Sequence, residues 1–409
     1  PSLSQAVHHS VHSSCWTPAT MADAARATAP PHHGSLPDEI TMEILVRLPP
    51  KSLLRYRAVC RAWRSATSTR GFLLAHHALQ PALPLLYGYN FVGDEVQSLD
   101  IIPFHQRAGA GQPQLQLQPV ARLEQDSDFH HLEACCDGLL VLSFRNTSVR
   151  DWRFAVCNPA TRQYAPLPLA YGSGVEYSLL GMYPHIPTGD YRLLMYRASA
   201  LMHGELVPAA AQDGSYIFTL GSGQPPRHIG FLDAEALTYT SGFVLFRGSL
   251  HWHPLGSMIT VFDTRTELFR QMRAPVVPGH AKLFEMDETL GMSGLNDAAT
   301  TIDIWVAQDY EREVWACNYR VDFPVAELTV RFGRFDESSW VVAVPWDGDV
   351  LLLVNFGDWL LQVDIEGKLV ATFHRRGLGP ANLRLKQTLV QHTFFPTLEG
   401  YVANSLPFI

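Results

Sequence analysis

The segment HLEACCDGLLVLSF, residues 131–144, and the segment FAVCNPATRQYAPLP, residues 154–168, decide the fold of most of this chain. Short apolar runs alternate in them with Asp-Gly and Asn-Pro pairs, which favour tight turns between strands. Residues 241–276, with SGFVLFRGSLHWHP and ITVFDTRTELFRQMRAP, and residues 338–374 repeat the pattern. Each repeat predicts three strands joined by turns.

The repeats are regularly spaced along the chain. Their turn glycines, Gly138, Gly248 and Gly348, lie 110 and 100 residues apart, so each interval has room for one further unit, around residues 176–232 and 280–333. A period of about 50 residues with four short strands is typical of a kelch-like β-propeller. An irregular pair of β-sandwiches is the alternative architecture.

A propeller needs strands from both ends of the β domain to close, and we place this domain at residues 85–409. About six units fit only if the strands at Leu85–Phe91 and Ile101–Phe104 share one blade with strands at Thr388–Phe395 and Gly400–Phe408. An open propeller would expose two long edge strands, which promote aggregation. We therefore expect a closed ring of about six blades.

A different pattern precedes the strands, in LPDEITMEILVRLPPKSLLRYRAVCRAWRSA, residues 36–66. Ser35 and Asp38 form an S-x-x-D helix start, and Pro49-Pro50 ends the helix because proline supplies no N–H. The apolar residues between them recur at helical spacing: Ile40, Ile44 and Leu48. Two further short helices are predicted downstream, one with Leu53, Leu54 and Tyr56 and one with Val59, Cys60, Trp63 and Ala66, and the helical domain covers residues 35–80.

The helical stretch resembles the F-box, the motif that docks onto the Skp-type adaptor of cullin-RING ubiquitin ligases. The matching segments are Leu36-Pro37-Asp38-Glu39, Glu43-Ile44-Leu45-Val46-Arg47-Leu48-Pro49, Lys51-Ser52-Leu53-Leu54-Arg55 and Val59-Cys60-Arg61-Ala62-Trp63-Arg64. The strand region is similar to the F-box-associated domain of plant F-box proteins at Cys136–Leu140 and Cys157–Arg162. The resemblance implies an α+β multidomain protein, a small helical F-box followed by a large all-β domain.

The resemblance also implies a function, that of the substrate-recognition subunit of an SCF-type ubiquitin ligase, with an unidentified target protein bound by the β domain. The residues implied to dock on the adaptor are Leu36, Pro37, Ile40, Ile44, Leu45, Leu48, Pro49, Leu53, Leu54, Val59, Cys60 and Trp63. Periodicity alone allows a helical cap packed on the chain's own main domain. A propeller-based enzyme with such a cap, and an F-box protein that acts outside the ligase, are the alternatives.

Charge divides the chain unevenly. The formal net charge is −8 over 409 residues, yet residues 36–77 carry seven Lys or Arg against three Asp or Glu, which leaves about −12 elsewhere. A basic module on an acidic body argues against general nucleic-acid binding and favours an acidic protein partner at one end.

The cysteines and the N-terminus indicate a compartment. The six cysteines include no C-x-x-C pair and are too sparse for a disulfide scaffold, which favours reduced thiols and a soluble protein of the nucleus or cytoplasm. No apolar run is long enough to span a membrane. We expect residues 1–34 to be a disordered leader and Met21 to be the natural start.

No cofactor, metal or catalytic residue is predicted. His251 and His253 could share one face of a strand, but a zinc site needs a third ligand, and we expect the pair at a partly solvated blade edge. Asp347, Asp349 and Asp358 resemble a glycosidase pair only by proximity, since turns at strand ends favour Asp for their own reasons.

Overall fold

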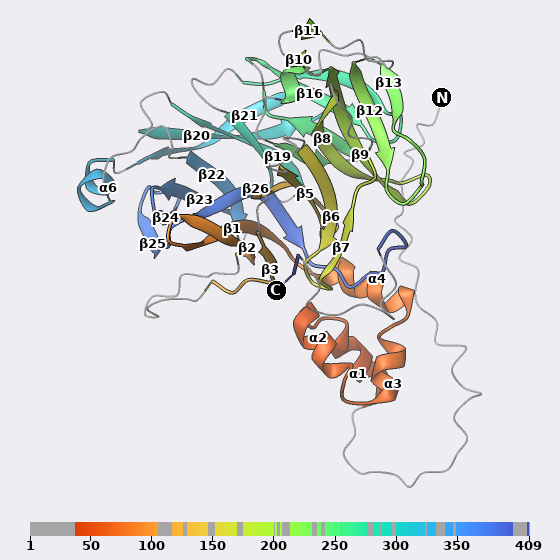
Figure 1. Ribbon diagram of the computed structural model, residues 1–409. Helices are drawn as coiled ribbons and strands as arrows, with labels where there is room; N and C mark the ends of the chain where they lie inside the picture. The colour runs from red at the N-terminus through yellow and green to blue at the C-terminus, as the bar shows by residue number, and fades with distance from the viewer. Residues whose placement is uncertain are drawn as a thin grey trace, which may run out of the picture. The chain divides into compact units, whose positions relative to one another are not determined.

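The computed structural model describes residues 37–104, 117–125, 129–145, 152–169, 175–199, 201–202, 205–206, 213–230, 235–238, 242–254, 256–275, 281–286, 288–296, 300–323, 325–332, 340–346, 349–395 and 407–408 (Figure 1). Along the chain they divide into two compact units, one up to Ile44 and one from Leu45 onward. The second unit holds most of the helical region and all strands.

Four short helices come first: α1 Asp38–Leu45, α2 Pro50–Tyr56, α3 Arg61–Ala66 and α4 Arg70–Leu79. Local chemistry sets where they begin. Pro50 stands in the first turn of α2, where a missing N–H costs nothing. The Cys60 sulfur accepts the Trp63 N–H at 3.4 Å ahead of α3, and the Thr69 hydroxyl accepts the Phe72 N–H at 3.3 Å ahead of α4.

Two helix boundaries differ from the sequence prediction. α1 ends at Leu45, so Leu48 lies in the turn that follows rather than on the same helix. α3 begins at Arg61, so Val59 precedes it. The apolar periodicity extends beyond the end of α1 and ahead of the start of α3, because residues in the adjoining turns also have apolar side chains.

Beyond Gln80 the described chain is built of strands, apart from the short helices α5 Glu235–Thr238 and α6 Val325–Phe332. The strands are β1 Ala82–Val92, β2 Glu95–Pro103, β3 Ala121–Glu124, β4 Phe129–Cys136, β5 Leu139–Arg145, β6 Trp152–Asn158, β7 Gln163–Pro166, β8 Val175–His185, β9 Asp190–Ser199, β10 Leu201–Met202, β11 Glu205–Leu206, β12 Gly214–Thr219, β13 Arg227–Gly230, β14 Phe243–Phe246, β15 Ser249–Trp252, β16 Met258–Asp263, β17 Leu268–Arg273, β18 Ala281–Met286, β19 Thr289–Leu295, β20 Thr301–Asp309, β21 Val314–Asp322, β22 Trp340–Trp346, β23 Asp349–Phe356, β24 Trp359–Val363, β25 Leu369–His374 and β26 Leu378–Lys386.

These strands form a six-bladed β-propeller. Five blades are four-stranded antiparallel sheets that follow the chain, in the orders β4-β5-β6-β7, β8-β9-β12-β13, β14-β15-β16-β17, β18-β19-β20-β21 and β22-β23-β24-β25. The sixth has the order β26-β1-β2-β3. The innermost strands β26, β4, β8, β14, β18 and β22 contact one another in turn and return to β26, so the ring is closed. The predicted propeller is confirmed, and both weakly patterned intervals hold a blade.

The sixth blade is shared between the two ends of the β domain, as predicted, but with a different C-terminal strand. β1 pairs with β26 along one edge and with β2 along the other. The segment Thr388–Phe395, expected as a strand, has no strand structure. Of the expected strand at Gly400–Phe408 only the last two positions lie within the described residues, and Phe408 there bridges to Leu123 of β3.

Two-residue turns join the first two strands in two of the repeats. Asp137 and Gly138 have φ angles of 48° and 84°, and Arg247 and Gly248 have 47° and 72°, as a type I′ hairpin turn requires. Gly138 has a second reason to be glycine. A Cβ there would lie 2.4 Å from the carbonyl oxygen of Lys386, so the glycine lets β26 approach this turn closely.

Candidate functional site

The N-terminal helices expose several of the apolar side chains that the sequence assigned to adaptor docking. On α1, Ile40 and Ile44 are each 47% exposed. From α2 to α3, Leu54 is 40% exposed and Val59 is 65% exposed. Cys60 is also exposed, although its sulfur caps α3.

Other members of the assigned set are buried. Leu45 and Leu53 are 2% and 0% exposed, so both stabilise the fold from inside. Leu48 and Trp63 are half-buried, and the Trp63 ring lies 5.9 Å from that of Tyr56. Pro37 and Pro49 are exposed, and Leu36 lies outside the described residues. The assigned set therefore mixes surface residues with core residues.

Basic side chains lie between the exposed apolar residues in the sequence of residues 50–66. Lys51, Arg55, Arg61 and Arg64 are exposed. Arg57 is held more firmly, because its guanidinium donates to the Ser68 hydroxyl at 2.6 Å. This segment therefore combines exposed apolar side chains with exposed positive charge.

Helix α4 is joined to one end of the propeller by polar contacts (Figure 1). The His77 Nδ1–H donates to the carbonyl oxygen of Gln387 at 3.3 Å, and the Lys386 ammonium donates to the carbonyl oxygen of Ala78 at 3.1 Å. His77 Nε2 lies 3.6 Å from Asp137 Oδ1, and the Tyr191 hydroxyl donates to Asp137 Oδ2 at 3.0 Å. The His77 contact is the main cause that lowers the pKa of Asp137.

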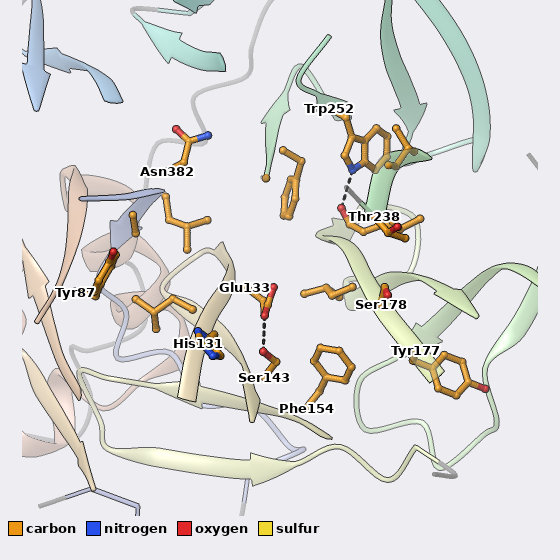
Figure 2. A pocket seen from close by; sticks show the side chains of 18 of the residues that line it. Tyr87, His131, Glu133, Ser143, Phe154, Tyr177, Ser178, Thr238, Trp252 and Asn382 are labelled. Carbon is orange, nitrogen blue, oxygen red and sulfur yellow. Dashed lines mark hydrogen bonds between the residues drawn. The ribbon is translucent and has the colours of Figure 1, made fainter. Parts of the chain in front are cut away.

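The propeller contains a cavity of about 680 Å³, within the range typical of small-ligand and side-chain pockets. Strands β1, β2, β4, β5, β6, β8, β14, β15 and β26, together with α5, line it (Figure 2). The lining residues are Tyr87, Tyr89, Leu99, His131, Leu132, Glu133, Ser143, Phe154, Tyr177, Ser178, Leu179, Leu180, Leu237, Thr238, Gly242, Phe243, Trp252, Ala381, Asn382 and Leu383.

The cavity wall is aromatic with one acidic group. The Ser143 hydroxyl donates a hydrogen bond to the Glu133 carboxylate (Figure 2). Burial raises the pKa of Tyr87 to about 12, and burial together with the nearby Glu133 carboxylate raises the pKa of Tyr89. The indole of Trp252, which is 1% exposed, donates to the carbonyl oxygen of Leu180 at 2.9 Å and is fixed in place. Sequence reasoning missed this cavity.

The two histidines singled out as metal candidates are buried and hydrogen-bonded, so the expectation of a partly solvated edge was wrong. His251 Nδ1–H donates to the Ser249 carbonyl oxygen at 3.0 Å, and its Nε2 accepts from the Tyr310 hydroxyl at 2.8 Å. Burial lowers the pKa of His251 to about 4, so the ring is neutral at physiological pH. His253 Nδ1 accepts the Leu283 N–H at 2.9 Å. Both rings act in packing between blades.

The other candidate chemistry can be placed only in part. Asp358 lies exposed in the turn between β23 and β24, whereas Asp347 lies outside the described residues. Among the residues that the structure describes, no group of three or more His, Cys, Asp and Glu side chains could hold a metal ion. None of the helices in the described ranges has the length and apolar character needed to cross a lipid bilayer.

Comparison with known proteins gives matches to both regions. Residues 33–79 match the F-box-like family, and residues 111–352 match the family described as F-box associated beta propeller domain. F-box protein At5g49610 of Arabidopsis thaliana is 26% identical over 68% of this chain and 77% of its own length. F-box only protein 8 of the same plant is 27% identical over 59% of this chain and 80% of its own length.

Proposed function

This chain belongs to the F-box proteins that carry an F-box-associated β-propeller domain, and from that premise we propose that it is a substrate receptor of an SCF-type (cullin-RING) ubiquitin ligase. The F-box docks on a Skp-type adaptor, and the propeller binds a target protein within reach of a ubiquitin-charged enzyme. The receptor itself is not a catalyst, because it supplies proximity to other subunits. It acts in the nucleus or the cytoplasm.

The observation that carries the proposal is the set of exposed apolar side chains with basic neighbours on short helices. Ile40 and Ile44 on α1, and Leu54 and Val59 from α2 onward, are large apolar residues left in solvent. Large apolar side chains exposed in this way mark interaction sites rather than folding cores. The neighbouring basic side chains favour an acidic partner by electrostatic complementarity.

The direction of the inner strands supports separate roles for the helical region and the cavity. All inner strands of a propeller run in the same direction, and here α4 contacts the ends of two of them, at Asp137 after β4 and at Lys386 of β26. The cavity draws on residues that precede these ends, among them Glu133 of β4 and Ala381 of β26. The contacts of α4 and the cavity therefore use different residues of the same inner strands.

The test is a titration of the purified chain with a purified Skp-type adaptor. Replacement of Leu54 and Val59 together by Ala should weaken binding at least about tenfold, because exposed apolar anchors at an interface centre dominate affinity. Leu48 and Trp63 are poorer choices because both are half-buried.

The matched control replaces Leu74 and Leu79 by Ala. These residues lie on α4, are 46% and 54% exposed, and are outside the predicted docking set. Their replacement should leave adaptor affinity unchanged. Equal affinity of the two double variants would contradict docking through the F-box. Absence of a cullin from complexes that retain the adaptor would favour action outside the ligase.

A further inference from the structure

We propose that the cavity of the propeller binds a cationic side chain, Arg or Lys, presented by the target protein. This inference rests on the proposed receptor function and names the chemistry of its substrate. The cavity interrupts the packing of the propeller, and its lining sets the charge and shape of what can enter.

The first argument is the way in which the backbone makes the cavity. The pairing of β4 with β5 shifts register between Leu132 and Ala134, so Glu133 is an unpaired, bulged residue. β8 shifts between Leu179 and Gly181, and β26 shifts where β1 passes from Pro84 to Leu86. Bulges turn side chains away from the regular alternation and are concentrated next to functional sites.

All three irregularities coincide with the cavity. The residues that they displace are Glu133 on β4, Leu180 on β8 and the stretch 381–383 on β26, and every one of them lines it. These are three inner strands that follow one another around the ring. Regular strands would pack apolar side chains across this space, so the shared interruption opens the hollow there.

The second argument is charge. Among the described residues that line the cavity, Glu133 is the single carboxylate and none is Lys or Arg. Besides tyrosines, the other ionisable side chain in this described lining is His131, which is exposed. Glu133 is half-buried and receives a hydrogen bond from Ser143, which orients the carboxylate within the cavity (Figure 2). A partly desolvated carboxylate in a cavity whose described lining holds no Lys or Arg favours a cationic ligand.

The third argument is the aromatic wall. Tyr87, Tyr89, Phe154, Phe243 and Trp252 contribute ring faces or edges to the lining, and ring faces attract ammonium and guanidinium groups. Their rings also accept the apolar stem of a long basic side chain. Burial keeps both tyrosines near Glu133 neutral, because it raises the pKa of Tyr87 and of Tyr89. A planar guanidinium fits such a site better than a compact ammonium.

The experiment uses the full chain bound to its adaptor and two short probes. One is the peptide acetyl-Gly-Gly-Arg-Gly-Gly-amide, and the other has citrulline in place of Arg, which keeps the shape and removes the charge. Saturation-transfer NMR should detect the Arg peptide at least about tenfold more tightly bound, because a hydrogen bond to a charged group is worth more than a neutral one. Equal binding of the two peptides would overturn the proposal without any mutation.

A variant locates the site. Glu133→Gln keeps an oxygen that can accept from Ser143 and removes the charge, and it should reduce binding of the Arg peptide to that of the citrulline peptide. Glu95→Gln, at an exposed position at the start of β2, is the matched control and should bind the Arg peptide as the unmodified chain does. Retention of full Arg-peptide binding by Glu133→Gln would place the cation elsewhere and overturn the inference.

A third probe distinguishes a guanidinium on a protein side chain from one on a free small molecule. Agmatine carries the same group without a peptide, and binding of agmatine with exclusion of the Arg peptide would overturn the assignment to a protein side chain. Adaptor affinity, measured on the same samples, should be unchanged in Glu133→Gln. If the unmodified chain does not bind the adaptor, the proposed receptor function is refuted. If it binds the adaptor but the peptide tests fail, only this inference is refuted.

Discussion

The helical region and the propeller treat apolar side chains in opposite ways. The helices leave Ile40, Ile44, Leu54 and Val59 largely exposed. The propeller buries long continuous runs, such as Leu351 to Val354 of β23, between neighbouring blades. Short helices have too few neighbours to cover all of their apolar residues, whereas each blade is covered by the next one around the ring. The inner runs of the blades are therefore covered within the ring, whereas the exposed apolar side chains of the helices are available to a partner.

The largest expected effect on burial in the propeller comes from opening its closed ring of blades. Deletion of residues 378–409 removes β26, leaving β1 with an unpaired edge and the inner ring with a gap. We expect loss of cooperative thermal unfolding and of most soluble protein, because an open edge strand promotes aggregation. Soluble yield and a thermal melt measure this.

A shorter truncation provides the control. Deletion of residues 396–409 keeps β26 and removes the bridge between Phe408 and Leu123. This variant should remain soluble and unfold cooperatively at a lower temperature than the full chain. If the longer deletion melted like the shorter one, β26 would not be required for closure.

A buried residue of the helical region should behave like the propeller core. Leu53, which the sequence assigned to docking, is fully buried. Replacement by Ala should lower the free energy of unfolding by about 2–5 kcal/mol, as for other large-to-small core changes. Urea denaturation measures it. Leu74→Ala, at a 46% exposed position on α4, is the control and should change stability by no more than about 0.5 kcal/mol.

The smallest expected effect concerns the polar junction between α4 and the propeller. The pKa of Asp137 is lowered in the folded protein, chiefly by His77, so its contribution to stability is present above the unfolded pKa and is lost as pH falls through the folded pKa. Asp137→Asn should therefore destabilise at pH 7 and make no difference well below about pH 4. The Asp137 side chain is 42% exposed, so we expect less than about 1 kcal/mol.

Urea denaturation at pH 7 and at pH 3 tests the sign. Asp190→Asn, at an exposed position nearby in sequence to Tyr191, is the control and should show no such difference. A larger effect of Asp137→Asn at pH 3 than at pH 7 would contradict the assigned role of His77.

The sequence predicted the blades well where a turn contains a residue pair typical of turns, such as Asn-Pro or Asp-Thr. It predicted a blade less well where the turn has the same backbone conformation but lacks such a pair. Asn158 and Asp263 each accept hydrogen bonds from the two N–H groups that follow in their turns. Asp309 makes a similar turn in the blade that showed a weak pattern. The left-handed residue that ends each turn is Arg162, Glu267 or Glu313, with φ angles of 56°, 57° and 59°. A non-glycine residue in that position leaves no signal in sequence.

The cavity could not be predicted for a different reason. Glu133 faces it because of a register shift, and a shift of one residue reverses the side of the sheet on which every later side chain lies. The shift depends on how β4 pairs with β5 and not on local composition. Asn382 reaches the same cavity from β26, whose partner β1 lies near the start of the β domain. The single carboxylate of β4, Glu133, was the available signal.

The shared blade also affects the order of events during synthesis on the ribosome. Ala82 pairs with Lys386, so the first strand of the propeller waits for a segment made roughly 300 residues later. At typical elongation rates of about 5–20 residues per second, that delay is on the order of 15–60 seconds. During that time the N-terminal helices have already emerged, but β1 lacks its β26 partner. Because an unpaired strand edge promotes aggregation, we expect chaperones to bind the nascent chain. If the helices dock on an adaptor as proposed, they can bind it before the propeller is closed and before the cavity is formed.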